Sequence, residues 1–146
     1  MHSQVTWISE GYVLECAIGH EVGLIQSVEL SKELTLLLTA AKSKLHILFN
    51  IAAMEHTEIN LTLLSTVLLP LLYYPACGWV ILYGVDHEAD QLFDLSFTRT
   101  YRTRFRTCGT QQEALDLLKA KDKRLLLNET EHPELPMITE SATYPE

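Results

Sequence analysis

Apolar positions in the second half of the chain change their spacing several times. Residues 79–85 form a continuous apolar run, which is typical of a buried strand. Apolar positions at helical spacing follow over residues 88–97 and predict a helix. Over residues 102–107, arginine alternates with threonine or phenylalanine, as in a strand. Residues 110–118 begin with a helix-capping sequence and predict a second helix. This order of strand, helix, strand and helix predicts an α/β sandwich rather than a helical bundle or a barrel.

The first half of the chain extends the same pattern. Residues 4–9 and 12–18 are strand-like runs on either side of Glu10 and Gly11, and they predict a β-hairpin with a two-residue turn. Near-helical apolar spacing predicts a helix over residues 26–43. The apolar run at residues 45–51 is typical of a central strand. We therefore expect a two-layer α/β sandwich over residues 1–127, with a mixed, mostly parallel sheet of about five strands and four helices.

An uncharged segment lies between Glu58 and Asp86 and is long enough to cross a bilayer. Pro70, Pro75 and Gly78 interrupt it, and polar residues recur within it at helical spacing. We interpret it as an amphipathic helix over residues 59–74, a turn at residues 75–78 and a buried strand from residue 79. Membrane insertion is therefore not expected, and Pro70 should either bend the helix or leave residues 71–74 as a separate last turn.

Two helix starts carry recognisable caps. Thr57 can accept a hydrogen bond from an exposed amide at the start of the uncharged helix, where Glu58 suits the helix dipole. Thr110 and Glu113 have the spacing of a capping box. The boundary at Thr110 is the best determined in the sequence.

Charge and composition narrow the classes of partner. The formal net charge is −8, and acidic residues without any lysine or arginine gather in residues 128–146, together with three prolines. Such a segment buries too little apolar surface to offset its ordering entropy, so we expect a flexible tail. The rest of the chain is nearly balanced in charge, and nucleic acid is not an expected partner because phosphate binding requires clustered cations.

The cysteines and the N-terminus point to an intracellular protein without a cofactor. Cys16, Cys77 and Cys108 are widely spaced, and no Cys/His pattern suits zinc, so we interpret them as reduced, buried thiols and expect no metal. The first residues contain no basic segment followed by an apolar core, so a cytoplasmic location is expected.

Catalytic devices are sparse. Cys77 and His56 would be the simplest nucleophilic pair, but they should face opposite ends of the sheet, so catalysis is not expected. Arginines at positions 99, 102, 104 and 106 form a cationic patch suited to carboxylate or phosphate oxygens. Three interpretations stay open for Arg99, Arg102, Arg104 and Arg106: protection of an edge strand, an anion or partner site, or cover by the acidic tail.

The chain resembles the STAS domain family (sulfate transporter and anti-sigma factor antagonist) and its SpoIIAA-like members in the order of its elements. The likeness also includes the loop after the central strand, the ending at residues 105–118, and the central strand itself, Leu45-His46-Ile47-Leu48-Phe49-Asn50-Ile51. The resemblance implies a non-enzymatic regulatory domain whose loop serine is phosphorylated by a partner kinase. Here Asn50 stands where the family has an aspartate, and the loop contains no serine. Thr57 is therefore the candidate phosphoacceptor, with a plain helix cap as the alternative.

Two functional hypotheses follow. The first is a regulatory or protein-interaction domain of the kind that belongs to signalling or partner-switching systems. It would contact a protein partner or a second copy through residues 52–59 with His56, the exposed side of the uncharged helix and the arginine strand. The second is a module that binds an apolar or anionic small molecule, or a cryptic enzyme. Its pocket would lie between the helix and the sheet, near Tyr73, Tyr74, Trp79 and the arginines.

Overall fold

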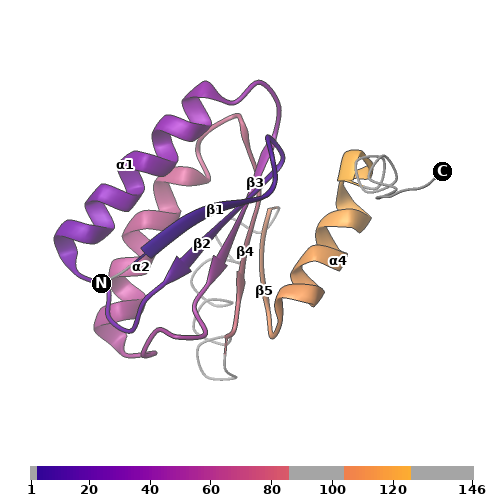
Figure 1. The fold of residues 1–146 in the computed structure, drawn as a ribbon. Coiled ribbons are helices and arrows are strands. Elements are labelled where there is room, and N and C mark those ends of the chain that lie inside the picture. Colours follow the sequence, from indigo (N-terminus) through magenta and orange to yellow (C-terminus); the bar gives the residue numbers. More distant parts are fainter. Residues whose placement is uncertain (1–2, 86–103, 126–146) are drawn as a thin grey trace. The chain divides into compact units, whose positions relative to one another are not determined.

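The computed structural model describes residues 3–85 and 104–125 (Figure 1). Its elements follow in the order β1 (Ser3–Ser9), β2 (Val13–Ile18), α1 (Leu24–Ala40), β3 (Leu45–Asn50), α2 (Glu58–Leu71), β4 (Cys77–Tyr83), β5 (Phe105–Cys108) and α4 (Gln111–Lys121). The helix predicted over residues 88–97 lies outside the described residues. By its internal contacts the chain divides into two units, Met1–Ala114 and Leu115–Glu146.

The five strands form one mixed sheet in the order β1-β2-β3-β4-β5. Strand β1 is antiparallel to β2, whereas β2, β3, β4 and β5 are parallel to one another. Helices α1 and α2 pack side by side on one face of the sheet (Figure 1). The predicted α/β fold with a mixed, mostly parallel sheet of five strands is confirmed.

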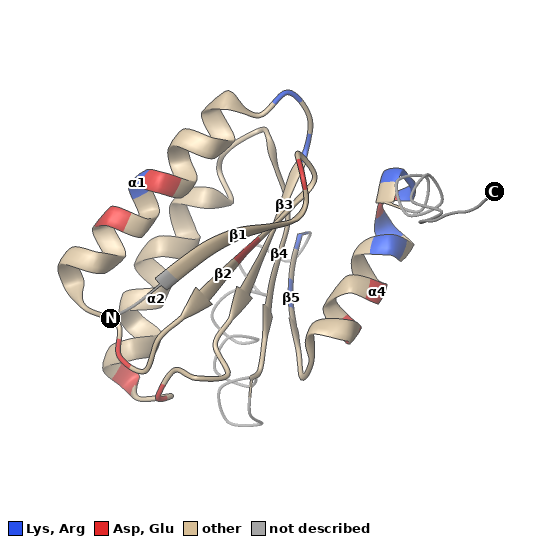
Figure 2. Ribbon diagram, viewed as in Figure 1, with Lys and Arg blue, Asp and Glu red and all other residues tan. Residues whose placement is uncertain are grey.

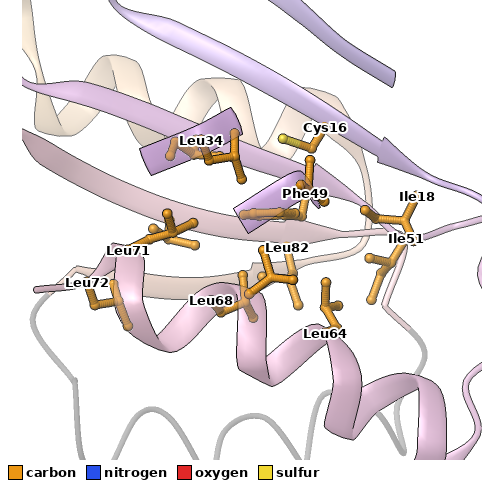
Figure 3. Packing of buried hydrophobic residues seen from close by; sticks show 14 of the residues in the cluster. Cys16, Ile18, Leu34, Phe49, Ile51, Leu64, Leu68, Leu71, Leu72 and Leu82 are labelled. Carbon is orange, nitrogen blue, oxygen red and sulfur yellow. The ribbon is translucent and has the colours of Figure 1, made fainter. Parts of the chain in front are cut away.

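The main core lies between this face and the two helices. Alternate residues of the strands point towards α1 and α2, and Phe49 near the end of β3 is completely buried, as are Leu34 of α1 and Leu68 of α2 (Figure 3). Each such side chain contributes on the order of 1.5–3 kcal/mol when it is fully buried. The apolar periodicity that predicted these elements is therefore the same one that fills the core.

The hairpin turn differs from the prediction. Ser9 pairs with Val13, so three residues rather than two connect the strands, and the Tyr12 N–H donates to the Ser9 carbonyl over 2.9 Å. Gly11 has a φ of +82°, a value that glycine adopts at little cost. A bulge between Trp7 and Ser9 shifts the register by one residue, which the alternation of the sequence does not reveal.

Strand β4 begins earlier than predicted. Cys77 pairs with Leu45 of β3, so residues 77–78 belong to the strand rather than to the turn. The strand passes closely over the His46 ring, whose Nδ1 accepts a hydrogen bond from the Trp79 N–H over 2.9 Å. A Cβ at Gly78 would lie only 2.4 Å from Nδ1, so glycine is required there by this contact and not by a turn.

Helix α2 ends at Leu71, and the N–H groups of Tyr73 and Tyr74 donate to the carbonyls of Pro70 and Leu71. Residues 72–74 therefore form a short turn after the helix, which begins one residue later than the separate turn predicted over residues 71–74. Within residues 3–85 and 104–125, none of the helices combines the length and apolar character needed to cross a bilayer.

Candidate functional site

The carboxyl ends of the parallel strands meet the starts of both helices, and a tightly held loop closes this end. After β3, the Asn50 carboxamide oxygen accepts from the Ala52 N–H over 3.1 Å, and the Ile51 N–H donates to the Tyr83 carbonyl of β4 over 3.0 Å. Gly84 has a φ of +81°, and a Cβ at this position would lie 2.7 Å from Ala52. The loop over residues 51–57 is thus fixed against the end of β4.

Asn60 in the first turn of α2 connects this loop to the loop before α1. Its Oδ1 accepts from the Val22 N–H over 3.1 Å, and its Nδ2 donates to the Glu55 carbonyl over 2.7 Å and to the His20 carbonyl over 3.4 Å. The side chain is buried, so these bonds replace its hydration. Asn60 therefore positions both loops, and sequence reasoning missed it.

The two predicted loop residues have different surroundings. Thr57 is exposed, and its Oγ1 accepts from the Asn60 N–H over 3.2 Å, which confirms the predicted cap of α2. His56 is half-buried, and its Nε2 lies 3.1 Å from the Ile51 carbonyl oxygen. Because a carbonyl can only accept, this contact places a proton on Nε2.

Four large apolar side chains are exposed at the same end of the molecule. Leu24, Ile25 and Val28 belong to the first two turns of α1, and Ile59 to the first turn of α2, with exposed fractions between 48% and 72%. The hydrogen bond from Val22 to Asn60 holds the two helix starts together. We call these four residues the carboxyl-end patch.

Among the described residues, the charges nearest the starts of the two helices are acidic, and the first lysine of α1, Lys32, lies one turn beyond Val28. The carboxylates of Glu21, Glu29, Glu55 and Glu58 are exposed around it. The His20 Nε2 lies 3.9 Å from Glu55 Oε1. Neither lysine nor arginine occurs in residues 3–31 or 45–85, and Figure 2 shows acidic but no basic residues at the start of α2. The patch is thus an apolar surface with an acidic rim.

The two described arginines of the predicted cationic patch, Arg104 and Arg106, make different contacts. Arg104 precedes β5, which begins only at Phe105, and its guanidinium donates to the Cys77 carbonyl over 2.6 Å and to the Leu72 carbonyl over 3.4 Å. Arg106 is exposed and lies 5.1 Å from the ring centre of Trp79. Arg99 and Arg102 lie outside the described residues. Phe105 faces the core, as predicted. Strand β5 is an edge of the described sheet.

The cysteine and the histidine that could have formed a catalytic pair are not brought together. Cys77 begins β4 and His56 follows the end of β3, so they lie at opposite ends of parallel strands, as predicted. Burial raises the pKa of the Cys77 thiol from 9.0 to about 11, against a smaller opposing effect of Arg104. Burial also raises the pKa of Cys16 strongly, and both groups are therefore neutral thiols near pH 7.

A polar cluster on the other face of the sheet was also missed. Glu15 Oε1 accepts from the Tyr83 hydroxyl over 2.7 Å and from the Gln111 Nε2 over 2.7 Å. Tyr83 is nearly buried, and desolvation, followed by the bond to Glu15, raises the pKa of its hydroxyl. The cluster ties β2, β4 and the start of α4 together.

A groove of about 370 Å³ lies at the amino end of the parallel strands. Trp7 of β1, the hairpin turn and the last turn of α1 line it, whereas Tyr73, Tyr74 and Trp79, predicted near a ligand pocket, do not. Near Tyr73 and Tyr74, the Arg104 guanidinium lies beside the end of α2, where it donates to the Leu72 carbonyl.

Comparison with known proteins agrees with this architecture. No family model matches the chain, and no curated protein matches it. A search of solved structures finds the anti-sigma factor antagonist SpoIIAA in its unphosphorylated form, with 13% sequence identity and a TM-score of 0.52 over 82% of this chain and 97% of that one. The chain therefore has the SpoIIAA-like STAS fold, which confirms the fold implied by the resemblance in sequence.

Proposed function

We propose that this chain is a regulatory domain of the STAS type that binds a protein partner through the carboxyl-end patch. The observation that carries the proposal is the gathering of Leu24, Ile25, Val28 and Ile59 as exposed side chains on two adjoining helix starts. A contiguous apolar surface with a polar rim is characteristic of a protein-binding site. The hydrogen bonds of Asn60 support this role, because they hold the two helix starts in a fixed arrangement before binding.

The rim defines the chemistry of the partner. Exposed carboxylates around the patch attract a surface that carries lysine or arginine around an apolar centre. The exposed side of α2 extends the contact area, because the helix is uncharged beyond Glu58. Thr62 and Thr66 are exposed on this side, and Tyr73 is exposed just after the helix ends. Charge attraction makes the association sensitive to salt, and the apolar centre supplies most of the affinity.

We further propose Thr57 as the phosphoacceptor that switches this binding. Its hydroxyl is exposed between the loop and α2, directly beside the patch. A phosphate there would add about −1.5 to −2 charges next to Glu58 and would change the affinity for the partner. Phosphopeptide mapping of the protein from its native cells tests this part. Its consistent failure to find modified Thr57 would remove the switch and leave the docking surface in place.

Substitutions of matched exposure test the docking surface. A partner that copurifies with the chain from its native cells is identified, purified and titrated against each variant by calorimetry. We expect Ile59→Lys to weaken binding at least tenfold, because it removes apolar contact and opposes the basic rim of the partner. Leu36→Lys is the control, since Leu36 is 70% exposed against 72% for Ile59 but lies three turns further along α1 than Leu24. Equal affinities of the two variants would contradict the proposal.

A further inference from the structure

Among the described strands, β1 is the edge of the sheet opposite β5. Within the described residues β1 is hydrogen-bonded only to β2, so the backbone groups on its other side, over seven residues, have no strand beside them. Exposed edges of this kind are templates for pairing with another chain, and proteins usually protect them with charge or proline.

The protection expected for such an edge is absent from β1. Residues 3–9 contain no charged residue and no proline, whereas Arg106 stands on the edge strand β5 at the other side of the sheet. Trp7 and Ile8 of β1 are 43% and 40% exposed. The bulge at Ile8 ends regular pairing on that side, so the segment from Ser3 to Trp7 is the part able to form a ladder.

We propose that two copies of this chain form a homodimer by antiparallel pairing of their β1 strands around a twofold axis at Val5. This register places Val5 opposite Val5 of the other copy, and Gln4 opposite Thr6. It extends the two sheets into one of ten strands. A twofold contact requires a surface that complements itself, and an uncharged antiparallel strand meets this requirement because no like charges become opposed.

The charge distribution favours contact between two copies at this edge over contact through the rest of the surface. The protein as a whole is acidic, with a formal net charge of −8, so contacts between copies through most of its surface are opposed. Glu10, the first charge after β1, stands five residues from the proposed axis. The two Glu10 carboxylates of a dimer would be about 30 Å apart, well beyond the Debye length of about 8 Å. Glu15 of the neighbouring strand is engaged by Tyr83 and Gln111.

The apolar groove adjoins this edge and adds to the contact. Trp7 forms part of its wall on the same side of the sheet as Val5, together with Leu37 of α1 and Ala41, the residue that follows this helix. In the proposed register Trp7 faces Ser3 of the other copy. Burial of the half-exposed indole would then contribute to association in addition to the backbone hydrogen bonds.

Sedimentation velocity of the full chain over a wide range of concentration tests the proposal. We expect the wild type to reach twice the chain mass of 16.6 kDa, and Gln4→Lys/Thr6→Lys to remain at the mass of one chain, because lysines gather at the axis. Thr62→Lys/Thr66→Lys is the control, since it adds the same charge at exposed positions of α2 and should leave the dimer unchanged. A wild type that stays monomeric, or equal effects of the two variants, would overturn the proposal.

A disulfide assay tests the register. Residues opposite each other in antiparallel strands have Cα atoms about 4.5–5.5 Å apart, within disulfide reach, whereas two copies of position 4 would be offset by about 7 Å along the strands. A mixture of Gln4→Cys and Thr6→Cys chains should therefore form the mixed disulfide in excess over either symmetric one, with the wild type as the control for native thiols. Random proportions would contradict the register. Neither assay involves Ile59, so failure here is distinguishable from failure of the partner site.

Discussion

Asn60 shows how much of this site depends on a single buried side chain. Its carboxamide accepts from the loop before α1 and donates to the loop after β3, and the α2 cap provided by Thr57 is one turn away. A carboxamide offers both a donor and an acceptor in one planar group, and both are used here. The positions of Leu24 and Ile59 relative to each other therefore follow from this residue.

We expect Asn60→Ala to lower the free energy of unfolding by about 2–4 kcal/mol, because it leaves the Val22 N–H and the Glu55 carbonyl without their partner. Urea unfolding measures the change. Thr62→Ala, at an exposed position of the same helix, should change the free energy by less than about 0.5 kcal/mol. Equal stability of the two variants would show that Asn60 does not hold the loops.

The buried thiol of Cys77 predicts a loss of stability at alkaline pH. Its pKa rises from 9.0 to about 11 on folding, so the folded state binds more protons than the unfolded state between these values. Stability is therefore full below pH 9 and falls as the pH approaches 11, by about 2–3 kcal/mol for this group. Cys16 and Tyr83, whose pKa values are also raised, act in the same direction.

Urea unfolding between pH 8 and 11 under reducing conditions measures this effect. Cys77→Ala should be less stable than the wild type at pH 8 because it leaves a cavity, but its stability should fall less steeply above pH 9. An identical pH dependence of the two proteins would show that the thiol does not contribute.

Local pattern was sufficient to predict some residues of the site and insufficient for others. The caps at Thr57 and Thr110 follow from neighbours within one helical turn, and both are confirmed. Asn60 and Glu15 act through partners 38 and 68 residues away in sequence, at Val22 and Tyr83. Such pairs depend on which strands are neighbours, and no spacing in the sequence records this.

At the level of elements, the spacing of apolar residues predicted the type and the order of the helices and strands well. It predicted their first and last residues less well. The helices and the central strand lie within a few residues of their predicted bounds, because burial of one face imposes the period. Alternation placed Phe105 in the core correctly but extended the strand to Arg102, whereas β5 begins at Phe105. Alternation indicates on which face of the sheet a side chain lies. The length of a strand depends instead on how far it pairs with the adjacent strand.

The different contacts of Arg104 and Arg106 give a prediction about β5. Arg104→Met should lower the free energy of unfolding by about 1–3 kcal/mol, since the carbonyls of Cys77 and Leu72 lose their donor. Arg106→Met should cost less than about 1 kcal/mol, the usual contribution of an exposed cation and ring pair. Thermal or urea unfolding distinguishes them. A larger loss for Arg106 would contradict the assigned contacts.

At the scale of the whole molecule, two exposed surfaces differ in chemistry. The carboxyl-end patch combines exposed apolar side chains with an acidic rim, which we assign to a basic partner. The β1 edge offers uncharged backbone, which we assign to a second copy. Because the two surfaces consist of different residues, partner binding and dimer formation should be separable by substitution.

The central claim is that a partner docks on the carboxyl-end patch. The most direct measurement places a photo-crosslinking amino acid at position 59 of the full chain in its native cells, with the same group at the equally exposed position 36 as the control. We expect the group at position 59, and not at position 36, to become attached to one protein, at an apolar segment flanked by lysine or arginine. Attachment at similar yield from both positions, or to segments without basic residues, would contradict it.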